Sequence, residues 1–394
     1  MIFFAFVIDI KTHCDIIVAA LKIQKKTCAE KGKENMKIPE LLTTISGEKI
    51  TDKEGWENFR RPEIMNLMSE YIYGVRPVER PDDLHFKTVR KEDGFGEKNI
   101  LFEKIEVCFK GYSFDVYAYL PNDKKEKVPA FIYVMHEFQE DKCNLDESIE
   151  CENVDIREII SRGFAVFIMP TRKLAPDWEH KANYKEGIYP LFETERKDNS
   201  WATISAWSWG ASRVMDYIET DERIDSKKVT VIGHSRGGKT ALWCGANDKR
   251  LYCAISNDSG CAGAAMHRTK EGEHIKDINI TDWFCNNYHK FNDREEMLPT
   301  DQHMLIAAMA PRLCYVASSS EDGWADPKAE RLSCRMAGEA YALYGKDGVI
   351  LPDEPVEINK AYHDGTIGYH VKTGEHGIDA FDWKMYLDFL QKKM

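Results

Sequence analysis

The sequence contains no apolar run long enough to cross a membrane and no stripe of basic residues. The apolar run at residues 2–8 has no lysine or arginine before it and is interrupted by Asp9. It is far shorter than the roughly 20 residues that span a bilayer. The net charge of −12 repels a phosphate backbone. We therefore expect neither a membrane nor a nucleic acid as a partner.

The chain also lacks cysteine pairs at the CxxC spacing typical of zinc sites. Its eleven cysteines, an odd number, are scattered along the chain, which favours reduced thiols in the cytoplasm over a secreted disulfide framework. No metal and no other cofactor is predicted. Residues 1–55 are interpreted as an N-terminal leader or extension, within which Met36 is an alternative start.

Hydrophobic and charged residues are present in the proportions of a globular protein. They make up 43% and 30% of the 394 residues, which is typical of a folded and not of a disordered chain. The length favours one main domain, which we expect at residues 56–394. The sequence carries no prediction of the oligomeric state.

Short apolar runs alternate with helical stretches from residue 128 onward. Runs that are hydrophobic on both faces are typical of parallel strands, so the alternation predicts an α/β fold with a mostly parallel, doubly wound sheet covered by helices on both faces. The predicted strands are residues 131–134, 164–169, 229–232, 253–256 and 313–317, and the predicted helices are residues 153–161, 201–220, 239–246, 327–344 and 379–392. Residues 56–80 are predicted to be helical and residues 82–126 to form antiparallel strands. Two irregular segments, residues 171–200 and 261–304, are expected over the carboxyl ends of the strands.

The segment at residues 229–242 indicates a serine nucleophile. It reads VTVIGHSRGGKTAL, an apolar strand followed by GxSxG and a helix. In the nucleophile elbow of the α/β-hydrolase fold, this tight turn needs glycines and presents the serine at a helix N-terminus, where backbone N–H groups stabilise an oxyanion. GxSxG alone occurs by chance, but the strand and helix around it favour the elbow. Ser235 is therefore the predicted nucleophile.

The histidine base and its acid are expected later in the chain. His376 lies between the strand-like residues 366–371 and the last predicted helix, where this fold carries its base. Asp258 and Asp322 follow consecutive strands, and both are open as the acid that orients the histidine. Asp322 occupies the position usual for the acid in this fold, whereas Asp258 occupies an alternative strand end. The alternative for each is a helix cap or a turn. His370 and His303 are interpreted as structural histidines.

Donors for the oxyanion are harder to find. The strand at residues 131–135 is followed by HEFQE and not by the glycine-rich HGGG of many esterases. Arg236, beside Ser235, can supply the missing donor as a permanent cation, unless it pairs with a nearby carboxylate. Lys239, one helical turn after Ser235, can reach substrate hydroxyls, the alternative being a solvated surface lysine.

GHSRGGK at residues 233–239 resembles the GCSRxGK signature of the glucuronoyl esterases, carbohydrate esterase family 15, with His234 in place of the cysteine usual in fungal members. The resemblance extends through residues 257–263, 282–285, 298–303, 310–312 and 321–327. It implies a metal-free serine hydrolase that cleaves esters of 4-O-methyl-glucuronate in xylan-type saccharides. It also favours Asp258, which stands where many members have a glutamate. The roles that it implies are nucleophile for Ser235, base for His376, oxyanion donor for Arg236, and uronate contacts for Lys239 and Trp324.

Two other functions stay open. One is an acetyl-xylan-type or other carbohydrate esterase. Arg236 and Lys239 argue against it, because the acetyl group of such a substrate has no hydroxyls for them to bind. A catalytically inactive hydrolase fold used for binding would not need the serine, the histidine and two candidate acids. Enzymes that act on wall polymers are exported, so secretion is the alternative to the cytoplasm.

Overall fold

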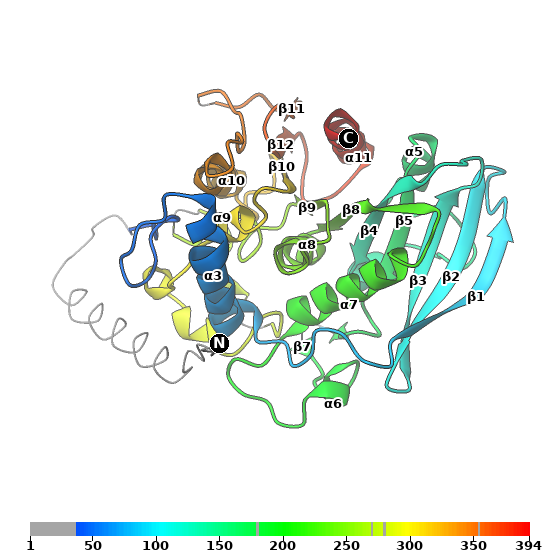
Figure 1. Ribbon diagram of the computed structural model, residues 1–394, viewed down its shortest axis with the longest axis horizontal. Helices are drawn as coiled ribbons and strands as arrows, with labels where there is room; N and C mark the ends of the chain where they lie inside the picture. Colours follow the sequence, from blue (N-terminus) through cyan, green and yellow to red (C-terminus); the bar gives the residue numbers. More distant parts are fainter. Residues whose placement is uncertain (1–36, 179–180, 269–270, 279–280, 354) are drawn as a thin grey trace, which may run out of the picture.

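A ten-stranded sheet forms the centre of the protein (Figure 1). The computed structural model describes residues 37–178, 181–268, 271–278, 281–353 and 355–394. The strands of the sheet are β1 (His85–Asp93), β2 (Ile100–Phe109), β3 (Tyr112–Pro121), β4 (Val128–Met135), β5 (Ala165–Pro170), β8 (Ile224–His234), β9 (Cys253–Asn257), β10 (Leu313–Ser319), β11 (Lys360–Tyr362) and β12 (Ile367–Lys372). Their order is β1-β2-β3-β5-β4-β8-β9-β10-β12-β11.

The middle of this sheet is parallel and its two edges are antiparallel. Strands β5, β4, β8, β9, β10 and β12 pair in parallel, whereas β1, β2 and β3 form an antiparallel edge and β11 closes the other side. The parallel strands are almost wholly buried, because their valine, isoleucine and alanine side chains meet helices on both faces. The predicted doubly wound sheet and its antiparallel leading edge are confirmed.

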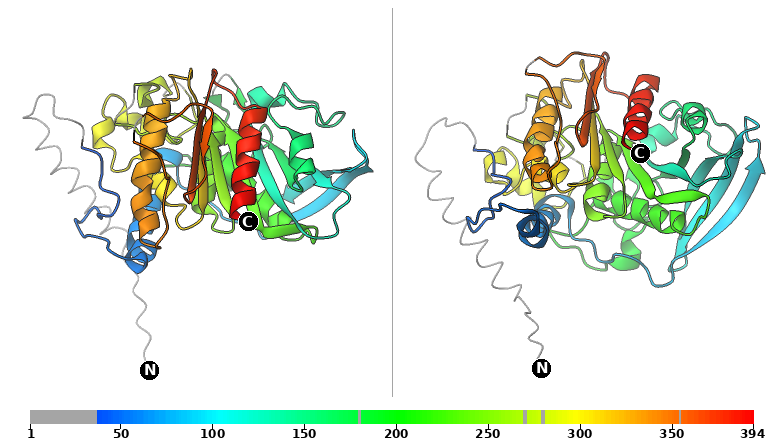
Figure 2. Two further views of the ribbon diagram at one scale, coloured as in Figure 1. Left: turned by 90° about the horizontal axis from the view of Figure 1, so that it is seen from above. Right: turned by 45° about the horizontal axis from the view of Figure 1, so that its top comes forward.

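Helices cover both faces of the sheet. Besides α2 (Lys53–Gly55) and the four-residue α4 (Glu137–Glu140) and α6 (Tyr189–Phe192), they are α3 (Arg61–Met68), α5 (Ile156–Ser161), α7 (Thr203–Ile218), α8 (Arg236–Asn247), α9 (Gln302–Ala307), α10 (Pro327–Ala342) and α11 (Ala380–Lys393). Apolar side chains of α7, α8 and α10 belong to one core, and those of α5 and α11 belong to a second core on the other face. Figure 2 shows α10 and α11 on opposite sides of the sheet near β12. No helix of the described ranges is both long and apolar enough to cross a membrane.

The first predicted helix is shorter than expected. Helical turns run from α2 through two π-helical turns, η1 (Trp56–Arg60) and η2 (Ser69–Tyr73), and end at Gly74. Gly74 has a φ of 86°, and a Cβ there would lie 2.4 Å from the carbonyl oxygen of Ser200. The expectation of a helix up to residue 80 was therefore wrong, because this glycine turns the chain and two prolines follow it.

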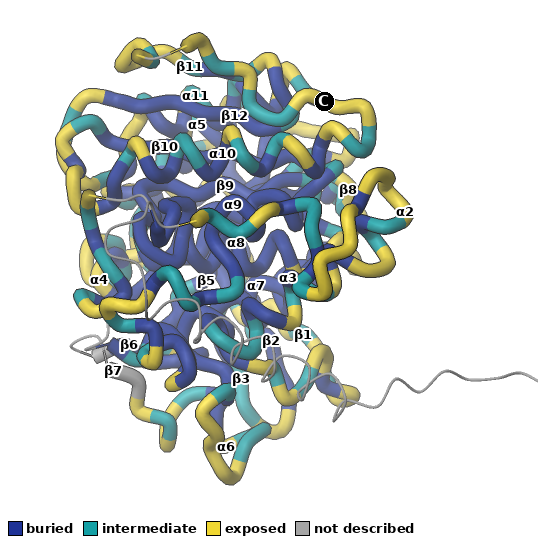
Figure 3. The backbone as a smooth tube through the Cα atoms, turned by 90° about the vertical axis from the view of Figure 1, so that its left-hand side faces the viewer, coloured by how far each residue is buried: buried dark blue, intermediate teal, exposed yellow. Residues whose placement is uncertain are grey.

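Two features bear on the predicted N-terminal extension. The apolar run at residues 2–8 and Met36 lie outside the described residues. Leu41 and Ile50, by contrast, are buried in the main core. Figure 3 shows buried backbone through the middle of the protein and exposed backbone at its periphery. The domain boundary at residue 55 stays a prediction.

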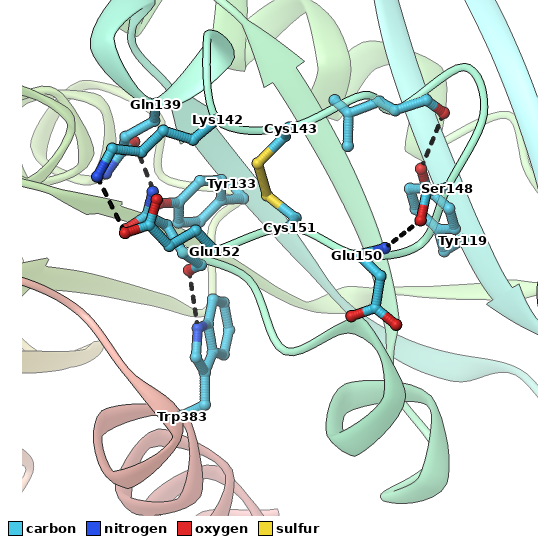
Figure 4. Close-up of a disulfide and its surroundings, with 12 residues drawn as sticks. Tyr119, Tyr133, Gln139, Lys142, Cys143, Ser148, Glu150, Cys151, Glu152 and Trp383 are labelled. Atoms are coloured by element: carbon cyan, nitrogen blue, oxygen red, sulfur yellow. Dashed lines mark hydrogen bonds and ion pairs between the residues drawn. A yellow bond between two sulfur atoms is a disulfide. The ribbon is translucent and has the colours of Figure 1, made fainter.

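One disulfide corrects the prediction that the thiols are reduced. Cys143 and Cys151 face each other across an isolated antiparallel bridge, with their Cα atoms 4.8 Å apart, and are joined (Figure 4). The pattern missed the pair because a loop, not a CxxC motif, brings the two residues together. The seven free cysteines of the described part of the chain are all buried. Disulfides persist in oxidising compartments, and the compartment itself stays a prediction.

Candidate active site

Ser235 lies on a sharp turn between β8 and α8. Its φ of 55° and ψ of −120° are unusual for a residue with a side chain. A Cβ on Gly233 would come within 2.2 Å of the backbone of Gly237, and one on Gly237 within 2.8 Å of the carbonyl oxygen of Val134. Only glycine fits at these two positions, which explains GxSxG. The turn places Ser235 at the N-cap of α8, where the first backbone N–H groups of the helix face outward.

His376 and Asp322 form a hydrogen-bonded pair at the same edge of the sheet. Nδ1 of His376 lies 2.6 Å from Oδ2 of Asp322. Oδ1 of Asp322 accepts the backbone N–H of Ala325 at 3.0 Å. Burial raises the pKa of Asp322, but the hydrogen bonds from His376 and Ala325 outweigh burial and leave this pKa below its ordinary value. An ionised carboxylate only accepts hydrogen bonds, so the proton of neutral His376 lies on Nδ1 and Nε2 is left as the base.

The His376 ring is next to the elbow. Its centroid lies 4.4 Å from that of His234, the residue that precedes Ser235. The structure therefore brings together the predicted nucleophile segment, the predicted base and one of the two candidate acids.

Asp258 lies beside this pair but bonds to other partners. Its Oδ1 accepts the backbone N–H of Ser319 at 2.7 Å, and its Oδ2 accepts the hydroxyl of Ser319 at 2.7 Å and the backbone N–H of Gly377 at 3.2 Å. Ligand atoms of Asp258, Asp322 and His376 lie within 4.8 Å of one another, close enough to be considered for a metal. The carboxylate oxygens already accept the hydrogen bonds described above, and Nδ1 of His376 donates to Asp322. This arrangement is typical of an acid–base site and not of a cation site.

A second buried carboxylate, Glu330 of α10, lies behind Asp258. It accepts the backbone N–H groups of Ser259 and Gly260 at 3.0 and 2.9 Å, and the hydroxyl of Ser318 at 2.6 Å. Burial is the main reason that the pKa of Glu330 is raised to about 7, and these donors only partly oppose it. Burial, and then the negative charge of Glu330, also raise the pKa of Asp258. At neutral pH the two carboxyls together therefore hold protons that an unfolded chain would have released.

This pair predicts a pH dependence of stability. Both carboxyls have pKa values above their unfolded values, so the folded state binds more protons than the unfolded state once the pH exceeds about 4. Stability therefore falls as the pH rises from about 5 to about 8. In Glu330→Gln the amide can accept from Ser259 and donate to Ser318, so we expect a smaller loss of Tm across this range than in the wild type. Equal slopes in thermal melts of the two proteins would contradict this assignment.

Arg236 is buried among groups that come from the two irregular segments. Its guanidinium forms an ion pair with Asp177 and lies over the ring of Trp283, with 5.3 Å between Cζ and the ring centroid. Nε1 of Trp283 also donates to Asp177, and Nη2 of Arg236 lies 3.5 Å from Nδ1 of His136. The sequence left two roles open for Arg236, an oxyanion donor or a partner of a nearby carboxylate, and the ion pair with Asp177 is present. This pairing does not exclude the oxyanion role, because the paired arginine keeps its positive charge beside Ser235. Planar contacts of this kind fix the orientation of a guanidinium.

Lys239 is buried and not solvated. Its ammonium group donates to the carbonyl oxygens of Ser259 and Cys261 at 2.5 and 2.7 Å and lies 3.3 Å from Oε2 of Glu273. The other carboxylate oxygen of Glu273 accepts Nε1–H of Trp324 at 3.1 Å. This hydrogen bond holds the indole of Trp324 at the site, although the residue is 59% exposed. Glu273 thus links the two residues that the family resemblance marks as uronate contacts.

Sequence reasoning missed Asp177, Glu273 and Trp283 as members of the site. The first two lie in irregular segments without a motif around them, and only DWFC at residues 282–285 carried a signal. The prediction that both segments lie over the carboxyl ends of the strands is consistent with their contacts to Arg236 and Lys239. His370 and His303 are buried, with hydrogen bonds to Asp382 and to the carbonyl oxygen of Pro39 respectively, as expected of structural histidines.

Several known proteins with related sequences and folds are esterases. A model of the family described as "Glucuronyl esterase, fungi" matches residues 105–345. Carbohydrate esterase MZ0003 of an unknown prokaryotic organism is 35% identical over 390 residues, which cover 91% of this chain and 89% of that protein. The glucuronoyl esterase from Solibacter usitatus superposes with a TM-score of 0.83 at 31% identity, covering 92% of this chain and 99% of the other. A promiscuous CE15 esterase from a marine bacterial metagenome gives a TM-score of 0.83 at 34% identity, with coverages of 93% and 98%.

The elbow, the histidine–aspartate pair and the mostly parallel sheet define a serine-type carboxylic ester hydrolase of the α/β-hydrolase fold. Within this class, the chain belongs to the glucuronoyl esterases of carbohydrate esterase family 15. The family resemblance of GHSRGGK is thereby confirmed.

Proposed function

We propose that this chain hydrolyses esters of 4-O-methyl-glucuronic acid carried by xylan-type saccharides. The observation that carries the proposal is the His376–Asp322 pair beside the Ser235 elbow, flanked by the Lys239–Glu273–Trp324 cluster. A uronate offers ring hydroxyls to such a polar cluster and a sugar face to an exposed tryptophan, whereas an acetyl group offers neither.

In the proposed reaction, Ser235 Oγ attacks the ester carbonyl carbon while its proton passes to Nε2 of His376. The carbonyl oxygen becomes an oxyanion near the N-terminus of α8 and Arg236. The bond to the alcohol then breaks, and the alcohol leaves with the proton from His376. A water molecule gives a proton to His376 and attacks the carbonyl carbon of the acyl-enzyme. The bond to Ser235 Oγ then breaks, Oγ takes the proton back from His376, and the uronic acid is released. Asp322 keeps the ring in the reactive tautomer and stabilises the imidazolium.

Arg236→Met tests the oxyanion role. We expect kcat to fall roughly 10²- to 10³-fold, as for the loss of one oxyanion donor, while KM changes little. Asp177→Asn is the matched control, because it removes the ion pair and retains the arginine. It should lower Tm, and it should lower kcat less than Arg236→Met does, because Trp283 still holds the guanidinium. An effect of Arg236→Met on KM alone would make the arginine a ground-state contact.

Trp324→Ala and Lys239→Met test the uronate side of the site. Both variants should lower kcat/KM on benzyl glucuronate by about fivefold or more, because stacking and sugar contacts contribute on the order of 1 kcal/mol or more each. Hydrolysis of p-nitrophenyl acetate should be affected little by Trp324→Ala. Lys239 also donates hydrogen bonds to two backbone carbonyl oxygens and one carboxylate. If Lys239→Met lowered kcat/KM equally on both esters, the role of this lysine would be structural.

The substrate class is tested with the wild-type protein. We expect kcat/KM on benzyl glucuronate to exceed that on p-nitrophenyl acetate by at least tenfold. Comparable values on the two esters would favour the second candidate, a carbohydrate esterase of broad specificity. One family member at 34% identity is itself described as promiscuous, which makes this comparison the informative one.

A further inference from the structure

A row of polar residues crosses the sheet directly beneath α11. His234 on β8 pairs in register with Asn257 on β9, Asn257 with Ala317 on β10, and Ala317 with His370 on β12. Residues in register point to the same face of a sheet. Asp382 of α11 occupies the space above the small Ala317, because its Oδ1 bonds to both Asn257 and His370.

These hydrogen bonds determine the tautomer of His234. The amide nitrogen of Asn257 donates to Tyr386 at 3.0 Å and toward Asp382 at 3.4 Å. The amide oxygen therefore faces His234, 2.6 Å from its Nδ1. Since an amide oxygen only accepts, His234 carries its proton on Nδ1. Its ring is held at one end by the buried row and cannot turn away.

Asp258 holds the backbone of the His376 loop at Gly377, which leaves the plane of the imidazole to be set by side-chain contacts. His376 lies between β12 and α11, and its side chain is 45% exposed. The hydrogen bond to Asp322 fixes one atom of the imidazole but not the plane of the ring. The ring of His234 lies 4.4 Å away, tilted by 48°, and covers one side of it.

We propose that His234 is a positioning residue for the general base, which holds the plane of the His376 ring so that Nε2 points toward Ser235. The proposal rests on the proposed function only in taking His376 as the base. His234 acts through this ring contact and does not exchange protons with the substrate.

The charges around His234 agree with a neutral support. Asp322 faces it from the end of β10, Lys372 lies on β12, Asp382 on α11, and Asp258 follows β9. Burial, and then the positive charge of a protonated His376, lower the pKa of His234 to about 3. The ring therefore stays neutral throughout the working range and adds no repulsion when His376 takes up the serine proton.

Two substitutions separate positioning from structure. His234→Ala removes the ring and the bond to Asn257, whereas His234→Phe removes the same bond and keeps a ring against His376. After active-site titration, we expect kcat on p-nitrophenyl acetate to fall at least tenfold in His234→Ala, with KM changed less than twofold. His234→Phe should retain at least a third of the wild-type kcat although both variants lose Tm. Equal kcat values for the two variants, or an effect confined to KM, would overturn the proposal.

His303→Ala is the matched control, since His303 on α9 is another buried histidine with a carbonyl partner, and that partner is Pro39 and not a residue of the site. Its kcat per active site should match the wild type within twofold. A second readout needs no substrate: the ring ¹⁵N signals of His376 should stay sharp in His234→Phe and broaden in His234→Ala. Sharp signals in both variants would count against positioning. The role of His234 is tested by hydrolysis of p-nitrophenyl acetate and by the ring ¹⁵N signals of His376. If the wild-type protein showed no preference for benzyl glucuronate, the proposed substrate would be overturned, but not this inference.

Discussion

Ser235→Ala is expected to abolish ester hydrolysis while the protein stays folded. Loss of a triad nucleophile costs roughly 10⁶-fold in kcat in a serine protease, and we expect a loss of the same order on benzyl glucuronate. The substitution removes one oxygen from a turn whose shape is set by Gly233 and Gly237. Circular dichroism and Tm should therefore change little. A variant that kept a tenth of the wild-type rate would show that Ser235 is not the nucleophile.

A covalent probe gives an independent control for this variant. A p-nitrophenyl alkylphosphonate phosphonylates an activated serine with loss of p-nitrophenolate, and the mass of the phosphonyl group should appear on the peptide that contains Ser235 in the wild-type protein. The same reagent should leave Ser235→Ala unlabelled. Labelling of any other serine at the same rate would contradict the assignment, even if the variant were inactive.

Those catalytic residues could be predicted that are marked by a short sequence motif or by the order of the strands and helices. A strand, a glycine-bounded turn and a helix around Ser235 are short-range features, and His376 follows from the order of the elements in the fold. The irregular segments could be placed only coarsely, because Asp177 and Glu273 reach Arg236 and Lys239 through loops whose path depends on tertiary packing. The Cys143–Cys151 disulfide was missed for the same reason.

The triad acid is where the pattern alone could not decide. Asp258 and Asp322 both follow parallel strands that lie side by side in the sheet, β9 and β10. Both therefore reach the neighbourhood of His376, and the family motif favours Asp258. What separates them is the set of donors at each carboxylate, which depends on the turns that follow the two strands.

The hydrogen bonds favour Asp322 as the acid that orients the base. Its Oδ2 lies 2.6 Å from Nδ1 of His376, and its pKa is held below the ordinary value, so it is ionised at working pH. Asp258 bonds instead to the backbone N–H of Gly377, the residue after His376. Burial raises its pKa, which weakens it as a partner for an imidazolium. We infer that Asp258 holds the loop and Asp322 holds the ring.

Asp322→Asn should therefore lower kcat by up to roughly 10⁴-fold, the loss known for the corresponding change in a serine protease. The reason is specific to this site. The backbone N–H of Ala325 donates to Oδ1 of Asp322, so the carbonyl oxygen of an asparagine would stay there and its NH₂ group would face Nδ1 of His376. That donor would force the ring proton onto Nε2 and block the base.

Asp258→Asn should lose only about tenfold in kcat, because it loosens the loop at Gly377 and leaves the tautomer unchanged. The double variant should match Asp322→Asn within about threefold, since a ring in the wrong tautomer gains nothing from a well-held loop. Steady-state kcat of the three variants on one soluble ester decides the question. If Asp322→Asn lost little and the double variant lost most of the activity, Asp258 would be able to replace Asp322, and the two carboxylates would share the role.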